Sequence, residues 1–420
     1  MNIRQLAYGV LWEVTQNGAY SNIALSRAFS EDVSPRDRAF AANLVYGVIQ
    51  QDLRLAYILK RYIKSKFAKI DPEVLVILKM AAYQMHFMDK VPQYAIVSES
   101  VSMTKRVKKS SAGGFVNGVL RAMMRDNDAI VYPKEELENL SVYYSYPKWF
   151  CKLIKEAYGD QTRTILQNGN LPPTNSVRVN TLLTTRDELM KQYEGAQKGK
   201  LSEDAVIFEK GFSYADDAGF LQGLYYPQDE AAMETAQMLA PISGQSVLDL
   251  CAAPGGKTTH MAQLMQNKGT ITACDIYEHK LKLIQDASSR MKINIIDPVL
   301  ADATIYRPEW ENKFDCVLAD VPCSGSGTLR RKPEIKWNMN EQGLDELCTQ
   351  QAVILNNAAR YVKPGGALVY STCSILPQEN KDIIATFFGS HGDCILQEEK
   401  QLLPESFDGF YMARLIKNKE

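Results

Sequence analysis

The stretch SVLDLCAAPGGKTTH, residues 246–260, decides the fold of the C-terminal half of this 420-residue chain. Its apolar run predicts a buried strand, which leads through a glycine-containing loop into a helical pattern. Strand patterns alternate with helical ones from about residue 236 onward, and further strands are expected at 269–276, 297–303, 314–321 and 366–373. Repeated strand–helix units predict a parallel, doubly wound α/β sheet, which DCILQ (393–397) and GFYMARLIK (409–417) close.

Three aspartates end the first three of these strands: Asp249, Asp275 and Asp302. Ligands of open α/β sheets bind outside the carboxyl ends of the strands, and an acid at the end of the second strand commonly accepts hydrogen bonds from ribose hydroxyls. A single aspartate there is often only a turn residue. Three in order beside a glycine loop predict a cofactor that contains a nucleoside.

The loop itself narrows the choice of cofactor. A Walker phosphate loop needs a glycine where this chain has Cys251, and the G-x-G-x-x-G fingerprint of NAD-binding loops is absent. Few phosphate-cradling glycines and several carboxylates suit a cofactor that lacks phosphate and carries positive charge. S-adenosylmethionine, with its adenine, ribose, cationic sulfonium and amino acid tail, fits this description.

Two cysteines follow strand patterns at the same predicted edge, Cys323 in DVPCSGSG and Cys373 in YSTCSILPQEN. We expect both thiols to face one pocket. A thiolate is a strong nucleophile, and a second thiol nearby can move a proton or reverse an adduct. The pair therefore indicates covalent catalysis on an electrophilic ring. Cys274, Cys316 and Cys394 fit a role as buried, inert thiols better.

The bulk composition predicts a reduced, metal-free, cytoplasmic enzyme. The eight cysteines are scattered without a C-x2-C pair, and the four histidines do not cluster, so we expect no zinc site. No apolar stretch approaches membrane length. The first residues, MNIRQLAYGVLWEV, have the pattern of an amphipathic helix and not of a signal peptide.

Residues 1–128 have helical apolar spacing interrupted by breakers such as Asn17-Gly18 and Asp71-Pro72, which predicts a helical bundle. Ser34-Pro35 has the pattern of an N-cap followed by proline in the first helical turn.

Residues 1–128 hold 18 Lys and Arg against 11 Asp and Glu, a charge of +7, whereas the remainder of the chain holds 30 against 38, a charge of −8. A basic first domain suits a polyanion, although a solvated surface fits the charge alone equally well. The basic residues form two runs, one of Lys60, Arg61, Lys64, Lys66 and Lys69 and one of Lys105, Arg106, Lys108 and Lys109.

The middle of the chain predicts helices over 130–165 and then a small α/β subdomain that contacts RNA. Its candidate strands lie at AVIFE (205–209) and GFLQGLYYPQDE (219–230), with a helix at RDELMKQYEG (186–195) between SVRVN (176–180) and the first of them.

Together, DLCAAPGGKTTH, DVPCSGSGTLRRKPEIKW, YSTCSILPQEN, YPQDEAA and DGFYMARLIK resemble the RNA cytosine-C5 methyltransferases. Upstream, SPRDRAFAANLVYGVIQQDLRLAYIL and VPQYAIVSESV resemble a NusB-type helical RNA-binding domain. This fusion is similar to the bacterial RsmB (Fmu/Sun) family, which modifies a cytosine of 16S ribosomal RNA. The resemblance implies an all-α NusB-like RNA-binding domain (1–130), linker helices with a small α/β RNA-contacting subdomain (131–235), and a Rossmann-like class I methyltransferase domain (236–420). Its partner would be 16S rRNA, free or within an assembling small subunit.

The resemblance also implies roles for single residues. Cys373 would be the nucleophile that adds to C6 of cytosine, Cys323 would assist release, and Asp320 would bond N3 or the exocyclic amine. The residues expected to hold S-adenosylmethionine are Cys251, Ala252, Ala253, Pro254, Gly255, Gly256, Lys257, Asp275, Asp302 and Asp320. The segment Arg330, Arg331 and Lys332 is a candidate clamp for RNA phosphates. Because cytosine C6 is unreachable inside a stacked helix, we expect a flipped or unpaired target.

Other interpretations stay open at this point. DNA cytosine-C5 methyltransferases use the cysteine of a Pro-Cys pair, so Pro322-Cys323 supports the reverse assignment of the two thiols. The chain also fits a tRNA cytosine-C5 methyltransferase, an amino-group methyltransferase, or a non-catalytic RNA-binding assembly factor. Amino-group enzymes usually carry a D/N-P-P-Y/F motif where this chain has DVPC, and they need no thiol.

Overall fold

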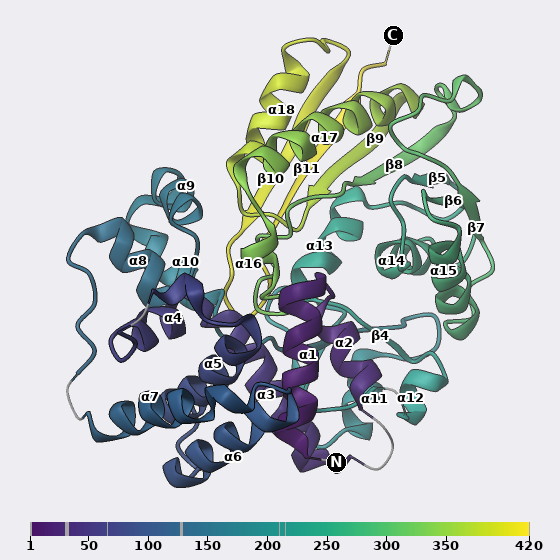
Figure 1. The fold of residues 1–420 in the computed structure, drawn as a ribbon. Coiled ribbons are helices and arrows are strands. Elements are labelled where there is room, and N and C mark those ends of the chain that lie inside the picture. The colour runs from purple at the N-terminus through teal and green to yellow at the C-terminus, as the bar shows by residue number, and fades with distance from the viewer. Residues whose placement is uncertain are drawn as a thin grey trace. The chain divides into compact units, whose positions relative to one another are not determined.

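The computed structural model describes residues 2–29, 33–64, 66–126, 129–209, 211–214 and 216–419. The chain forms two compact units, one of Met1–Asn170 with Leu329–Asn338 and the other of Leu171–Thr328 with Met339–Glu420. The first unit is helical and the second holds both sheets (Figure 1). Within the described residues, no helix has the length and apolar character needed to cross a membrane.

The helical unit follows the predicted helical spacing closely. Its first ten helices are α1 (Ile3–Asn17), α2 (Ser21–Ala28), α3 (Pro35–Gln50), α4 (Asp52–Lys60), α5 (Pro72–Phe87), α6 (Gln93–Arg106), α7 (Gly113–Arg125), α8 (Glu136–Tyr144), α9 (Lys148–Tyr158) and α10 (Thr162–Asn168). The predicted N-cap is confirmed, since the Ser34 hydroxyl accepts a hydrogen bond from the Asp37 N–H at 3.2 Å and Pro35 begins α3. The sequence pattern does not predict α2, which buries only two apolar side chains, Ala24 and Leu25.

A segment from the far end of the chain completes the helical unit. Residues Leu329–Asn338, which include α16 (Ile335–Asn338), directly follow the loop that carries Cys323. The buried Glu334 carboxylate accepts hydrogen bonds from the N–H and the hydroxyl of Ser21, at 3.1 and 2.7 Å. The buried Lys336 ammonium donates to the carbonyl oxygens of Gln50 and Ser145, both at 3.2 Å. Deleting residues 1–128 would remove Ser21 and Gln50, which bond Glu334 and Lys336. The segment Leu329–Asn338, which follows the Cys323 loop in the chain, would then lose these partners.

The same segment corrects one expectation. Arg330, predicted as part of a phosphate clamp, is buried in the helical unit and donates a hydrogen bond to the backbone oxygen of Asn168 at 3.1 Å. Lys332 is exposed, with its ammonium 5.6 Å from the centre of the Tyr20 ring. Of these two cations, only Lys332 is presented to solvent.

The smaller sheet belongs to the second unit and is antiparallel in the order β2-β3-β1-β4. Its elements are β1 (Asn175–Val179), α11 (Arg186–Gln192), β2 (Gln197–Lys198), β3 (Ala205–Phe208), α12 (Ala218–Leu221) and β4 (Tyr225–Pro227). The predicted strand over 219–230 is wrong at its start, where the Asp217 side chain accepts a hydrogen bond from the Phe220 N–H and caps the short helix α12.

The larger sheet has the order β10-β11-β9-β8-β5-β6-β7. Its strands are β5 (Ser246–Asp249), β6 (Thr270–Asp275), β7 (Ile296–Leu300), β8 (Phe314–Asp320), β9 (Val362–Thr372), β10 (Cys394–Leu402) and β11 (Phe410–Lys417). The strands β5 to β9 are parallel, as predicted. The two closing strands, β10 and β11, pair antiparallel, so the sheet is mixed. Only a short loop joins these two strands, too short for the crossover that parallel pairing requires.

Helices cover both faces of this sheet (Figure 1). They are α13 (Glu230–Leu239), α14 (Gly256–Leu264), α15 (Glu278–Arg290), α17 (Glu341–Tyr361) and α18 (Lys381–Phe388). Successive residues of β8 alternate between the two cores, with Val317 packed on the side of α17 and α18 and Leu318 on the side of α13 and α14. Burial on both faces explains why the strands read as continuous apolar runs.

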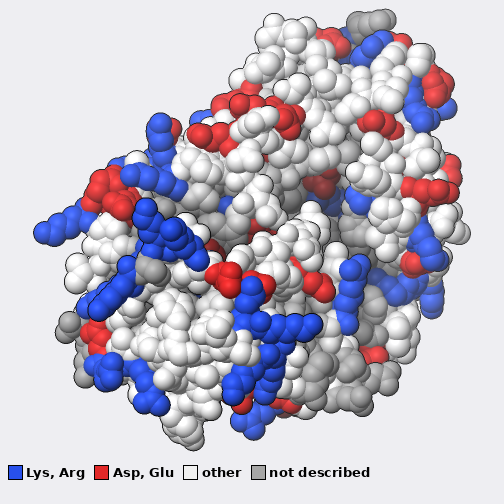
Figure 2. Space-filling model, in the orientation of Figure 1, with Lys and Arg blue, Asp and Glu red and all other residues white. Residues whose placement is uncertain are grey.

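Lysine and arginine side chains gather on the helical unit on the face drawn in Figure 2. All five members of the first basic run are exposed, and so are Lys105, Arg106 and Lys108 of the second. Some of these cations already pair with carboxylates, since Arg61 lies 3.3 Å from Asp126 and Lys109 lies 3.2 Å from Asp71. The exposed remainder is available to a polyanion.

Candidate active site at the carboxyl ends of the strands

The glycine loop between β5 and α14 adopts a backbone that only glycine accepts readily. Gly255 has φ of 101°, and a Cβ there would lie 3.4 Å from the Cα of Ile284 on α15. The loop turns directly into α14, whose Thr258 hydroxyl donates to the Asp249 carboxylate at 2.7 Å. The loop is thereby fixed at the carboxyl end of β5.

Beside this loop lies a cavity of about 410 Å³. Asp275, Asp302 and Asp320 line it from the ends of three different strands, together with Tyr277 and Ile354. Asp275 accepts a hydrogen bond from the Tyr277 N–H at 3.1 Å, which fixes the carboxylate at the cavity wall. Acidic groups on one side and an aromatic and an aliphatic side chain on the other suit a ribose and a flat purine ring.

A second cavity of about 210 Å³ shares Cys251, Ala253 and Asp320 with the first. Asp249 lines it and is almost fully buried, and its Oδ1 atom has no hydrogen-bond partner among the described residues. Burial raises the pKa of Asp249 to about 7, and the Asp320 charge adds to the rise, although the Thr258 hydrogen bond opposes it. A buried carboxylate with one unpartnered oxygen in a cavity wall suits a ligand that brings a cation.

The structure distributes the predicted cofactor residues over these two cavities. Cys251, Ala253 and Asp320 line both, Asp275 and Asp302 line the larger, and Ala252, Pro254, Gly256 and Lys257 line the smaller. Gly255 lines neither and serves the backbone turn. Tyr226 and Gln228 also line the smaller cavity and were not predicted as site residues, although both stand in the YPQDEAA segment that carries part of the family resemblance.

The two predicted thiols lie side by side. The Sγ atoms of Cys323 and Cys373 are 3.1 Å apart, because β8 and β9 are neighbouring parallel strands and each thiol follows its strand end. Asp320 connects them to the cavities: it accepts a hydrogen bond from Ser371, two residues before Cys373, at 2.8 Å. Its second oxygen accepts from the Lys257 ammonium at 2.7 Å.

The two thiols interact with each other and with the charged groups around them. The adjacent Cys373 sulfur raises the pKa of Cys323 well above its usual value, and burial adds to this rise. Burial lowers the pKa of Lys257, but the charge of Asp320 and its hydrogen bond outweigh this, so that the pKa is raised, and Cys373 contributes in the same direction. Two negative charges at this separation disfavour each other, so only one of the two sulfurs carries a thiolate at a time.

The three cysteines expected to be inert are buried in the sheet. Burial raises the pKa of Cys274 to about 12 and that of Cys316 and Cys394 to about 11. A buried thiol with a raised pKa is a poor nucleophile.

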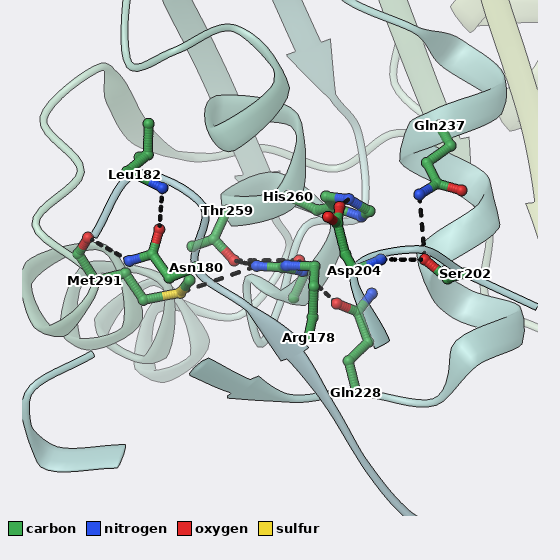
Figure 3. A network of polar contacts seen from close by, with 11 residues as sticks. Arg178, Asn180, Leu182, Ser202, Asp204, Gln228, Gln237, Thr259, His260 and Met291 are labelled. Atoms are coloured by element: carbon green, nitrogen blue, oxygen red, sulfur yellow. Dashed lines mark hydrogen bonds and ion pairs between the residues drawn. The ribbon is translucent and has the colours of Figure 1, made fainter. Parts of the chain in front are cut away.

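A residue without an assigned role supports the cofactor loop from the smaller sheet. Arg178 on β1 is fully buried, and burial lowers its pKa to about 9, so it stays charged near neutral pH. Its guanidinium donates to the Gly256 backbone oxygen at 2.5 Å, to the Thr259 hydroxyl at 2.8 Å and to the Gln228 side chain (Figure 3). One planar fork thus joins the SVRVN strand to the first turn of α14.

Arg178→Lys should lower the unfolding free energy by roughly 1–3 kcal/mol, because one ammonium cannot reach three fixed acceptors and a buried acceptor stays unpaired. It should also weaken S-adenosylmethionine binding, since the loop loses its support. Chemical denaturation and calorimetric titration measure the two effects. Arg163→Lys on the exposed face of α10 is the matched control. Unchanged stability and affinity in Arg178→Lys would contradict a supporting role.

The fold and the strand-end cavities define the C-terminal part of the chain as a Rossmann-like methyltransferase domain. The family described as 16S rRNA methyltransferase RsmB/F matches residues 236–416. The NusB family matches residues 1–125, and the ferredoxin-like domain of RsmF/B-like methyltransferases matches 146–215.

The probable ribosomal RNA small subunit methyltransferase B of Bacillus subtilis (strain 168) is 37% identical, with 99% of each chain covered. The corresponding protein of Shewanella oneidensis is 33% identical, again with 99% of each chain covered. The crystal structure of PH0851 superposes with a TM-score of 0.84 at 28% identity, covering 99% of this chain and 98% of the other. The chain therefore belongs to the 16S rRNA methyltransferase RsmB/F family, and the resemblance inferred from its motifs is confirmed.

Proposed function

We propose that this protein transfers a methyl group from S-adenosylmethionine to C5 of a cytosine in 16S ribosomal RNA through a covalent bond between Cys373 and C6. Family membership supports the cofactor and the class of RNA. The observation that carries the chemistry is the pair of sulfur atoms 3.1 Å apart, beside the aspartate that lines both cavities.

The cavities suit the cofactor in two parts. Asp275 and Asp302 would accept hydrogen bonds from the ribose and adenine in the larger cavity. Asp249 would pair with the ammonium of the amino acid tail in the smaller one, where its Oδ1 lacks a partner. When bound, S-adenosylmethionine supplies an electrophilic methyl group on a sulfonium.

The protein's own groups would make cytosine nucleophilic. The Cys373 thiolate adds to C6, and the electron pair of the C5–C6 double bond moves to C5, which then takes the methyl group. Asp320 bonds N3 or the exocyclic amine and favours this addition, while Lys257 holds Asp320 in place. The C5 proton then passes to a base, and Cys323 is the candidate, because the Cys373 sulfur no longer raises its pKa once it is bonded to C6. The C5–H electron pair re-forms the C5–C6 double bond as the Cys373–C6 bond breaks, which restores the ring and returns the Cys373 thiolate.

Position and substrate are tested together with RNA that carries tritium at cytosine C5. Methylation at C5 should release one tritium into water for each methyl group incorporated, and small-subunit rRNA should be a better substrate than tRNA. Reactions without S-adenosylmethionine are the control. Methyl incorporation without tritium release would indicate an amino-group enzyme, a preference for tRNA would overturn the rRNA assignment, and RNA binding without transfer would favour an assembly factor.

A further inference from the structure

Glu379 is a buried carboxylate that lies between the two cysteine loops. It ends a short 3-10 helix (Pro377–Glu379) and is inaccessible to solvent. It accepts hydrogen bonds from the Ser324 N–H at 2.7 Å, the Ser324 hydroxyl at 2.5 Å and the Ser374 hydroxyl at 2.5 Å. The Gln351 amide donates a fourth at 3.0 Å. Several hydrogen bonds to one buried side chain fix its position and the positions of the donors.

The two serines place this carboxylate next to the chemistry. Ser324 directly follows Cys323, and Ser374 directly follows Cys373. The loops are also joined by the Ser326 and Ser374 hydroxyls, which lie 2.8 Å apart, and the Ser326 hydroxyl accepts from the Ile375 N–H at 3.0 Å. Each thiol is therefore one residue away from a side chain held by Glu379.

The surroundings of Glu379 are rigid. Gln351 on α17 also donates to the backbone oxygen of Pro322 at 2.9 Å, immediately before Cys323. The Tyr370 hydroxyl at the end of β9 donates to the backbone oxygen of Glu379 at 2.6 Å. The carboxylate is thus anchored to α17 and β9 and holds both loops against them.

We propose that Glu379 is the positioning residue that sets the separation of the Cys323 and Cys373 sulfurs, so that the thiol of Cys323 stays within reach of the adduct formed on Cys373. The proposal rests on the function proposed above and adds to it the group that couples the two thiols. Glu379 acts through Ser324 and Ser374, and it touches neither cytosine nor cofactor.

Glu379→Gln keeps the size of the side chain, but its amide nitrogen cannot accept a hydrogen bond. Methyl transfer should fall by about 10- to 100-fold, the range expected when reacting groups are misplaced by an ångström or less. S-adenosylmethionine affinity should be unchanged, and the covalent RNA adduct should break down more slowly. Glu398→Gln, the same change at an exposed position of β10, is the matched control and should match the unmodified protein.

A double-mutant cycle separates positioning from a general structural effect. In a Cys323→Ala background, Glu379→Gln should not slow adduct breakdown further, because the thiol that it positions is gone. Additive effects, or normal breakdown in Glu379→Gln alone, would overturn the proposal. If Cys323→Ala itself accumulates no adduct, the proposed function is contradicted. If Cys323→Ala accumulates adduct but Glu379→Gln does not slow its breakdown, only the role of Glu379 is contradicted.

A readout without RNA keeps the proposal testable if Glu379→Gln folds poorly. Phenylarsine oxide binds tightly only when two thiols reach the same arsenic atom. Ser324→Ala removes one hydroxyl donor and leaves the carboxylate in place, so arsenical retention should fall at least severalfold while the circular dichroism spectrum is preserved. Retention equal to that of the unmodified protein in both Ser324→Ala and Glu379→Gln would overturn the proposal.

Discussion

Cys373→Ala should abolish both methyl transfer and the covalent RNA complex, whereas Cys323→Ala should form the complex and fail to release it. Removing a nucleophile commonly costs on the order of 10⁴-fold or more in rate, because the step that it opens has no substitute. Losing the assisting thiol leaves addition intact and blocks only the elimination that returns the thiolate. The expected result is an adduct that accumulates in one variant and is absent in the other.

A denaturing gel measures this directly, because only a covalent complex survives denaturation. The reaction needs a small-subunit rRNA fragment, S-adenosylmethionine and four proteins: unmodified, Cys323→Ala, Cys373→Ala and Cys348→Ala. Cys348 is a half-buried thiol on α17 and controls for the loss of a cysteine as such. The reverse pattern would make Cys323 the nucleophile, as the Pro322-Cys323 pair allows, and methyl transfer without any adduct would refute the covalent route.

Distance alone does not distinguish the two sulfurs, so the assignment of Cys373 as the nucleophile depends on the resemblance to the RNA cytosine-C5 methyltransferases. The adjacent Cys373 sulfur raises the pKa of Cys323, because two negative charges 3.1 Å apart disfavour each other. The covalent route therefore needs one thiolate and one neutral thiol in this pair. This asymmetry is what the two alanine variants examine.

The proximity of these thiols was predictable from the sequence because it follows from topology. In a parallel α/β sheet every strand ends at the same edge, so residues at the ends of β8 and β9 must come together once those strands pair. The same rule brings Asp275 and Asp302 to one cavity. The order of strands and helices in the sequence, with the parallel direction that it implies, is therefore enough to predict that these residues lie close together.

Features that depend on remote partners were not predictable. Arg330 has the pattern of an RNA-binding residue, yet its partner Asn168 lies 162 positions away in the helical unit. Glu379 stands in the PQEN motif, but its hydrogen-bond partners Ser324 and Gln351 are 55 and 28 positions away in the sequence, and no local pattern indicates them. The pairing of β11 with β9 likewise depends on a choice of neighbour that apolar patterning does not encode.

Asp249→Asn should weaken S-adenosylmethionine binding by roughly 100-fold, about 3 kcal/mol, and yet stabilise the unliganded protein at pH 8. The loss of affinity arises because a neutral amide cannot pair with the ammonium of the cofactor. The gain in stability arises because the carboxylate is buried with Oδ1 unpartnered. The rise of its pKa from 3.8 to about 7 corresponds to roughly 4 kcal/mol of opposition to folding at pH 8.

The sign of the pH dependence makes this prediction sharp. A carboxyl group with a raised pKa contributes stability that is fully present below pH 3.8 and is lost as the pH rises through about 7. The stability advantage of Asp249→Asn should therefore grow between pH 5 and pH 8 in thermal denaturation, while Asp297→Asn, at an exposed position of β7, should show no such trend. In the unmodified protein, cofactor affinity should fall as the pH drops below 7, because protonation removes the charge that the ammonium needs. A stability difference that does not change with pH would show that burial does not destabilise the charged form of Asp249. Full S-adenosylmethionine affinity in Asp249→Asn would show that this carboxylate does not hold the cofactor.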